Sequence, residues 1–216
     1  MVALAAVLFG VNGAVSKVIL QAGPGLSPAR LTEVRCTGAV IGLAALLLVL
    51  RPRGLAVTRR ELARFAVLGV AGLAAVTYAV YVLLAEREVR TRDPLSAACY
   101  AFLFAALFWS LLEPWWTFPG GRVGDSVSLL GNLAGTHLPL WALIAWMVVL
   151  GTIVPFGLIF GALRHATATR VAIVATLEPV VAILVAYAWL GESLEPIQLG
   201  GAVLVLGAIV LAQTAR

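Results

Sequence analysis

Apolar residues occur in long uninterrupted runs, and short segments of Arg, Glu, Gly and Pro separate these runs. A transmembrane helix needs about 20 consecutive apolar residues, whereas the strands of a membrane barrel alternate in polarity over about ten residues. The pattern therefore predicts an all-α integral membrane protein. About seven stretches qualify as transmembrane helices: residues 2–21, 29–50, 63–85, 95–116, 138–163, 171–190 and 197–212.

The segments between these stretches are short, with one exception. Residues 117–137 form the only long polar connection, and its Pro119-Gly-Gly121 breaker favours an exposed loop with an interfacial turn. The first apolar stretch has no basic segment before it, and Lys17 interrupts it where the core of a cleaved signal would continue. We therefore expect it to be retained as the first span.

Composition and charge support a membrane protein. Of the 216 residues, 62% are hydrophobic and only 12% are charged, and the mean hydropathy is +1.04. Arginines and the single lysine, Lys17, give the chain its net charge of +5. The arginines cluster between the apolar runs, which is typical of loops facing anionic lipid. This placement argues against nucleic acid as a partner. The Arg-rich, Ala-rich composition is typical of a bacterial protein, and the expected location is the cytoplasmic membrane.

No pattern of catalytic or metal-binding residues is present in the sequence. Cys36 and Cys99 lie within apolar runs without ligand spacing, so they are interpreted as small buried side chains. His137 and His165 lie in connections and have no partner residues of a known catalytic motif. We therefore expect no enzyme activity, no metal and no cofactor.

Several segments resemble EamA-type permeases of the drug/metabolite transporter superfamily. The resemblance is strong over residues 150–158, 168–172 and 176–202, the last of which opens Thr-Leu-Glu-Pro-Val-Val. It is weaker over Phe9-Gly-Val-Asn-Gly-Ala-Val-Ser-Lys17 and over residues 27–35, which are similar to the first two helices of that family. The resemblance implies a secondary transporter of ten helices, built as two inverted halves of five with both termini in the cytoplasm.

Seven predicted spans are three fewer than this family pattern. The third stretch looks composite, because residues 60–72 resemble the entry to the family's third helix and residues 76–87 resemble the exit of its sixth. Two units follow: residues 1–85 as an incomplete first repeat that includes the composite span 63–85, and residues 86–216 as the C-terminal repeat. A similar opening before two spans, Ser27-Pro28 and Asp93-Pro94, is a weak internal repeat.

The distribution of arginines tests this interpretation without the family. If all seven stretches cross the membrane once, the arginines divide almost evenly between the two sides. If the third stretch does not reverse sides, only Arg30 and Arg122 lie outside, which restores the normal positive-inside asymmetry. We infer that an odd number of helices is missing, through a natural deletion or an error in the gene model. A re-entrant third segment is the alternative.

Polar and aromatic residues inside the spans are the candidates for a substrate path or for ion coupling, because charge within a membrane is costly. Glu178 precedes Pro179, which frees a carbonyl four residues earlier. Arg35 matches a basic position of the family, whereas Glu33 is interpreted as interfacial and Glu113 as part of an end-of-span belt. The full candidate list is Glu178, Arg35, Lys17, Asn12, Tyr78, Tyr81, Tyr100 and Trp146.

Several of these candidates also have a purely structural interpretation. Lys17 can extend to the interface, Glu178 can solvate a vestibule, and the aromatic residues can anchor or pack helices. The leading functional hypothesis is a permease that moves small metabolites, such as amino acids or drug-like compounds, across the cytoplasmic membrane. The alternative is a truncated remnant or subunit that transports nothing without a partner, and homodimer formation is left open.

Overall fold

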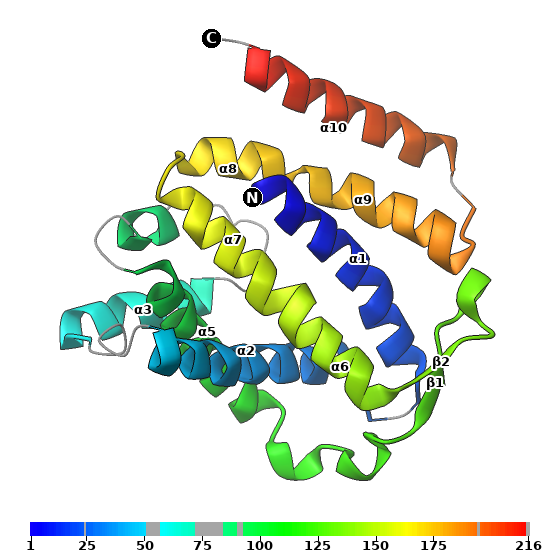
Figure 1. Ribbon diagram of the computed structural model, residues 1–216, viewed down its shortest axis with the longest axis horizontal. Coiled ribbons are helices and arrows are strands. Elements are labelled where there is room, and N and C mark those ends of the chain that lie inside the picture. The colour runs from blue at the N-terminus through cyan, green and yellow to red at the C-terminus, as the bar shows by residue number, and fades with distance from the viewer. Residues whose placement is uncertain (24, 51–56, 72–83, 90–92, 194, 215–216) are drawn as a thin grey trace.

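The computed structural model is a bundle of membrane-length helices, and it describes residues 1–23, 25–50, 57–71, 84–89, 93–193 and 195–214 (Figure 1). Five helices are long and apolar enough to cross a membrane: Val2–Gln21, Pro28–Leu50, Pro94–Leu112, Leu140–Leu163 and Ala168–Leu190. Pro196–Leu211 is a shorter apolar helix within the described residues. Most of the composite stretch lies outside the described residues, including the point at which its two family-like parts join.

The helices and strands follow one another as α1 (Val2–Gln21), α2 (Pro28–Leu50), α3 (Arg59–Ala71), a helical segment at residues 84–89, α5 (Pro94–Leu112), the strands β1 (Ser126–Ser128) and β2 (His137–Pro139), α6 (Leu140–Val148), α7 (Val154–Leu163), α8 (Ala168–Ala175), α9 (Leu177–Val185) and α10 (Pro196–Thr214). The π-helical segments η5 (Val149–Ile153) and η6 (Ala186–Leu190) extend α6 and α9. One membrane-length helix is therefore α6–η5–α7, and a second is α8–α9–η6.

Local capping explains where several helices begin. The Ser27 hydroxyl accepts from the Arg30 amide at 3.0 Å, and Pro28 then opens α2. Asp93 accepts from the Ser96 amide at 3.2 Å, and Pro94 likewise opens α5. Proline suits the first helical position because its missing N–H group would be unpaired there anyway. The two openings singled out in the sequence are therefore both capped helix starts.

Helix α1 lies between α9 on one side and α6–α7 on the other, while α2 packs on α5, and α5 on α3 (Figure 1). Phe9 of α1 and Phe102 of α5 both pack edge-on against Phe156 of α7, with ring centroids 5.2 and 4.9 Å apart. Helix α10 packs on α9 and α8, and most of its described side chains are exposed. The polar centre described below lies among α1, α2 and η5.

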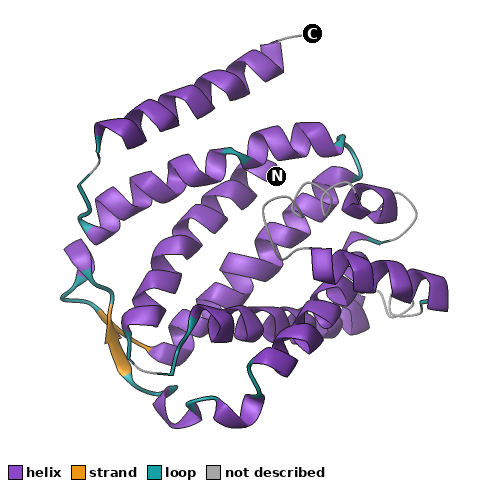
Figure 2. Cartoon of the chain, turned by 180° about the vertical axis from the view of Figure 1, so that it is seen from behind, coloured by secondary structure: helices purple, strands orange, loops and turns teal. Residues whose placement is uncertain are grey.

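The connection over residues 117–137 differs from the expected loop. It contains two short 3-10 turns, Gly120–Arg122 and Gly131–Leu133, and β1 pairs antiparallel with β2 so that Val127 lies opposite Leu138 (Figure 2). The indole of Trp189 donates to the Leu129 carbonyl at 2.9 Å, and the Asn132 amide donates to the Ala188 carbonyl at 3.0 Å. The connection is mostly exposed, as expected, but it contains more regular structure than one turn, because its contacts to Trp189 and Ala188 of η6 hold it in a defined conformation.

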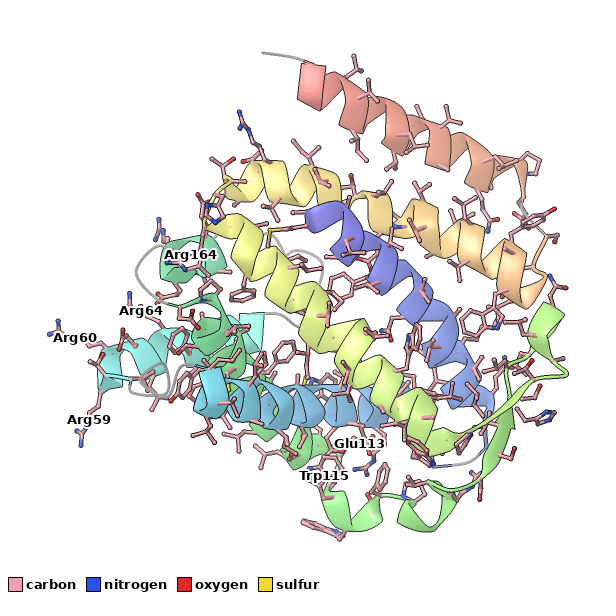
Figure 3. All side chains as sticks on the ribbon, in the orientation of Figure 1. Arg59, Arg60, Arg64, Glu113, Trp115 and Arg164 are labelled. Atoms are coloured by element: carbon pink, nitrogen blue, oxygen red, sulfur yellow. The ribbon has the colours of Figure 1, made fainter. Side chains whose placement is uncertain are left out.

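Exposed arginines gather at one end of the bundle. Figure 3 shows Arg59, Arg60, Arg64 and Arg164 on the same side of the molecule, away from Glu113. Arg64 of α3 forms an ion pair with Glu88 at 3.1 Å, so both described flanks of the third stretch meet at this end. Glu86 also accepts from the Ala168 amide at the start of α8, at 3.0 Å. This arrangement agrees with the charge argument, in which both flanks lie on one side.

Glycines allow α1 and α9 to approach closely. A Cβ atom added at Gly10 would lie 2.7 Å from Val181 Cγ1 and 3.0 Å from the backbone nitrogen of Ala182, whereas one at Gly13 would meet nothing within 4 Å. Glycine is unfavourable inside a helix by about 1 kcal/mol relative to alanine. Its presence at position 10 is explained by the close approach of the two helices.

We predict that Gly10→Ala destabilises the bundle by about 1–3 kcal/mol, because the added methyl group forces α1 and α9 apart. The matched control is Gly13→Ala on the same helix, which we expect to be neutral or stabilising by up to about 1 kcal/mol. Unfolding in mixed micelles against increasing denaturing detergent measures both. Equal stability changes for the two variants would contradict the close packing at Gly10.

Candidate functional site

A π-helical interruption lies midway along the α6–η5–α7 helix. Pro155 follows Gly151 by four residues and has no N–H group, so the Gly151 carbonyl cannot receive its normal helical hydrogen bond. The chain accommodates this by widening to a π-helix over Val149–Ile153. Segments of this kind are frequent at functional sites. The interruption leaves polar backbone and side-chain groups in the interior of an apolar helix.

Arg35 of α2 points at this interruption. Its Nε donates to Thr152 Oγ1 at 3.1 Å, and its Nη2 donates to the Gly151 carbonyl at 3.4 Å. Thr152 is buried, and its hydroxyl donates in turn to the Met147 carbonyl at 2.9 Å. Arg35 is therefore held in place by two groups of the π-helical segment, and within the described part of the chain its Nη1 makes no hydrogen bond.

Asn12 of α1 completes this polar centre. Its side chain is buried, and it lies so close to Gly151 that a Cβ atom at that position would collide with the amide group. The oxygen of the amide, Oδ1, is buried and has no hydrogen-bond partner among the described residues. A buried polar atom without a partner is costly, so a group that supplies a donor here would bind favourably.

Glu178 approaches from a second interrupted helix. Helix α8 ends at Ala175 and α9 begins at Leu177, and Pro179 in the first turn of α9 removes the donor for the Ala175 carbonyl (Figure 2). The Glu178 side chain interacts electrostatically with Arg35, although no hydrogen bond joins the two within the described residues. Glu178 is exposed, so its charge acts on Arg35 without direct contact.

We call Asn12, Arg35, Gly151 and Thr152 the central site. Together with Glu178, these residues offer a guanidinium, an amide, a hydroxyl and a carboxylate on four separate segments. Such a set can bind a small polar molecule through directed hydrogen bonds and through charges of both signs. Among the described residues no group of three or more His, Cys, Asp and Glu side chains could hold a metal ion.

The other predicted candidates lie away from the central site. Lys17 forms an ion pair with Glu192 in the connection after η6, and both side chains are exposed. Tyr100 stacks on Phe65 of α3 with ring centroids 5.5 Å apart, and Trp146 is exposed on α6. Tyr78 and Tyr81 lie outside the described residues.

A second polar cluster was missed by the sequence analysis. Glu33 was expected at the interface, but its residue is 0% exposed and Oε2 accepts from Arg30 Nη1 at 2.5 Å. Arg30 Nη2 also pairs with Glu113 at 3.0 Å, so Glu113 is more than part of an interfacial belt. The spacing of Arg30 and Glu33, three residues apart on one helix, was the available signal.

This second cluster joins the start of α2 to the end of α5. Arg30 Nη1 also donates to the carbonyls of Glu113 and Pro114 at 2.8 and 3.1 Å, and Nη2 donates to the Thr117 hydroxyl. Ser27 donates to Glu113 at 3.2 Å. The guanidinium thus adds donors to carbonyls just beyond the end of α5, where the helical ladder stops. We call Arg30, Glu33 and Glu113 the α2–α5 cluster.

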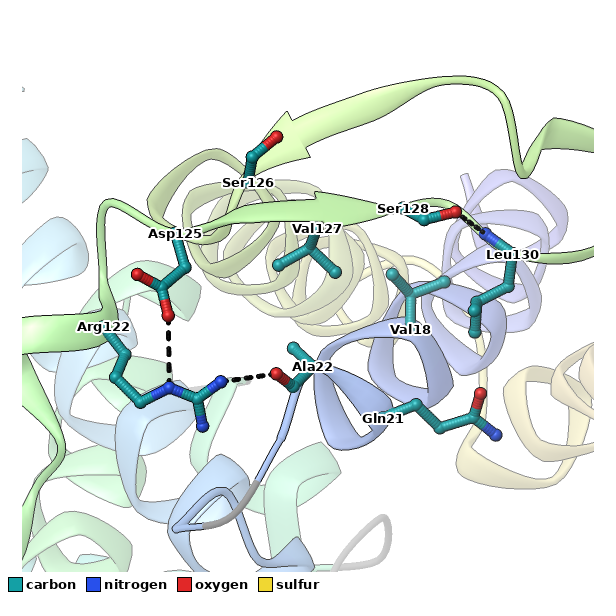
Figure 4. Close-up of a pocket in the computed structure, with 9 residues that line it drawn as sticks. All are labelled: Val18, Gln21, Ala22, Arg122, Asp125, Ser126, Val127, Ser128 and Leu130. Carbon is teal, nitrogen blue, oxygen red and sulfur yellow. Dashed lines mark hydrogen bonds and ion pairs between the residues drawn. The ribbon is translucent and has the colours of Figure 1, made fainter.

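A polar pocket of about 470 Å³ lies where α1 ends under β1 (Figure 4). Arg122 crosses it, donating to Asp125 at 3.1 Å and to the Ala22 carbonyl at 2.6 Å, which fixes the connection against the end of α1. Gly23 has a φ of +135° and lies against the Arg122 guanidinium, which leaves no room for a side chain. The residues that line this pocket were not among the sequence candidates.

We predict that Thr152→Val destabilises the bundle by about 1–3 kcal/mol, because Arg35 loses an acceptor and the Met147 carbonyl loses a donor in a buried setting. Thr32→Val is the matched control: its hydroxyl donates to the Pro28 carbonyl on an exposed part of α2, and we expect a change below about 0.5 kcal/mol. Detergent-induced unfolding compares them. Similar losses for both would show that Thr152 does not support Arg35.

The chain was compared with families, curated proteins and solved structures. The model of the EamA-like transporter family matches residues 70–214, which include α5 to α10 and therefore the π-helical interruption and Glu178. No curated protein and no solved structure gives a significant match. Because the family match spans more than half of the 216 residues, the chain belongs to the EamA-like transporter family.

Proposed function

We propose that this protein is a permease that moves small metabolites bearing both an acidic and an amino group, such as amino acids, across the cytoplasmic membrane. The observation that carries this proposal is the central site at the π-helical interruption, where Arg35 and the unpartnered Asn12 amide oxygen face the polar region from two helices. Interrupted helices supply the substrate groups of many secondary transporters near the middle of the membrane.

Charges of both signs favour a zwitterionic substrate. Arg35 can donate to a carboxylate, the Asn12 oxygen can accept from an ammonium group, and Glu178 balances the positive charge from the other side. A substrate carboxylate would replace or share the bonds that Arg35 now makes to Thr152 and Gly151. The hydroxyl and carbonyl of the π-helical segment thus keep the guanidinium satisfied when no substrate is bound.

A second candidate function is a membrane subunit that must associate with a partner before it transports. The observation that favours it is α10, whose described side chains are mostly exposed over an apolar helix, including Ile197 and Leu204. The composite third stretch inferred from the sequence favours it too, since missing helices would leave surfaces of the family bundle uncovered. The transport experiment below separates the two functions.

We predict that the purified chain in proteoliposomes exchanges amino acids in a counterflow assay, in which liposomes are loaded with an unlabelled amino acid and take up the labelled one. A panel of acidic, basic and neutral amino acids provides the probes. Arg35→Ala should reduce uptake by about 10- to 100-fold, the loss expected for a charge-assisted hydrogen bond of about 1.5–3 kcal/mol.

The matched control is Arg60→Gln, an exposed arginine at the start of α3, which should retain uptake within about twofold. Full uptake by Arg35→Ala would remove the central site from the proposal. Failure of the unaltered chain to take up any member of the panel would favour the partner-requiring subunit.

We also propose that the end of the bundle carrying Arg59, Arg60, Arg64 and Arg164 faces the cytoplasm, because positive loops are retained on that side. Cysteine labelling of intact bacterial cells with a membrane-impermeant maleimide provides the test. Gly135→Cys in the β1–β2 connection should be labelled from outside, whereas Arg60→Cys and Arg164→Cys should react only after permeabilisation.

The native cysteines give a low background in this experiment, because Cys36 and Cys99 are both buried. Labelling of Arg60→Cys and Arg164→Cys from opposite sides would contradict the shared location of the basic segments. Labelling of Gly135→Cys only after permeabilisation, with the other two reactive from outside, would reverse the proposed orientation.

A further inference from the structure

Two carboxylates share one guanidinium in the α2–α5 cluster. Arg30 Nη1 lies 2.5 Å from Glu33 Oε2, and Nη2 lies 3.0 Å from Glu113 Oε2. No other charged side chain occurs on the described elements that pack against this part of α2, namely α5, α6 and η5. With both acids ionised the cluster carries one uncompensated negative charge, and Glu33 is 0% exposed.

The unmatched charge falls on a buried atom. Glu33 Oε1 is buried and has no hydrogen-bond partner among the described residues. An ionised oxygen without a donor inside a protein is strongly disfavoured, and a bound proton removes the cost because it makes the group neutral.

The Ser110 hydroxyl lies beside the Glu33 carboxyl. It is within hydrogen-bond distance of the Ala106 carbonyl, at 2.8 Å, and of the Trp115 indole, at 3.2 Å. Because a hydroxyl can rotate, Ser110 can donate to the ionised acid or accept from the protonated one. It therefore fits either charge state of Glu33.

Solvent reaches the cluster through Glu113. Its side chain is 28% exposed, whereas those of Arg30 and Glu33 are nearly or fully buried. Glu113 lies at the end of the bundle remote from the exposed arginines, beside Trp115 (Figure 3). A proton from that side can therefore reach the cluster at the Glu113 carboxylate, which shares Arg30 with Glu33.

We propose that the α2–α5 cluster is a proton-binding site: one proton from solution converts one carboxylate to a carboxylic acid, held chiefly on Glu33, and no other bond changes. Coupling of this proton to transport rests on the proposed function. Arg35 of the central site lies on the same helix, two residues after Glu33. Loss of the proton leaves a net negative charge on the cluster at the start of α2. This charge favours a different position of α2 and therefore of Arg35, which lies on the same helix.

Infrared difference spectroscopy of the full chain in liposomes tests proton binding directly. We expect a protonated carboxyl C=O band that persists at neutral pH and disappears as the medium becomes alkaline. Glu33→Gln and Glu113→Gln should each abolish this neutral-pH band, because the remaining carboxylate is then matched by Arg30. Glu195→Gln, an exposed acid before α10, is the control and should leave the band unchanged.

Persistence of the band in Glu113→Gln would overturn the proposal, and so would a neutral-pH spectrum without any band that depends on Glu33 or Glu113. Should Glu33→Gln fail to fold, Glu113→Gln still decides, because Glu113 lies at a helix end and is partly exposed. The measurement needs no transport, so a chain that binds the proton but moves no amino acid would contradict only the proposed function.

Discussion

Two arginines of helix α2 determine how the bundle is held together, because a guanidinium inside a membrane protein must find acceptors within the protein. Arg35 donates to the Gly151 carbonyl, which Pro155 deprives of its normal helical donor, and Arg30 donates to the carbonyls of Glu113 and Pro114 just beyond the end of α5. Each arginine thus supplies a donor where a helix is interrupted or ends.

These two arginines lie on different faces of the same helix. They are five residues apart, which at about 100° per residue separates their directions by about 140°. Arg30 therefore faces α5 and Arg35 faces η5, in agreement with their observed partners. A rigid movement of α2 changes both contacts together, so the charge state of the α2–α5 cluster and the geometry of the central site are mechanically linked through one helix.

The sequence predicted most membrane helices closely, because apolar length and the Ser27-Pro28 and Asp93-Pro94 caps are local signals. It also singled out Arg35 as a candidate, since a charge in an apolar run is conspicuous. It did not reveal the partners of the two arginines: Arg30 contacts Glu113 and Arg35 contacts Gly151, each more than 80 positions away. The β1–β2 hairpin was missed for the same reason, because its contacts to Trp189 and Ala188 join residues far apart in the sequence.

The close approach of α1 and α9 limits how such a bundle can open. Gly10 brings α1 against Val181 and Ala182 without intervening side chains, while Lys17 and Glu192 join the same two segments at the other end through an exposed ion pair. An exposed pair contributes little stability and is easily exchanged for water, whereas the glycine contact depends on exact shape. Separation of α1 from α9 is therefore easiest at the Lys17 end, which is the end where Glu113 gives solvent access to the α2–α5 cluster. The weaker of the two contacts between these helices and the partly exposed Glu113 therefore lie at the same end of the bundle.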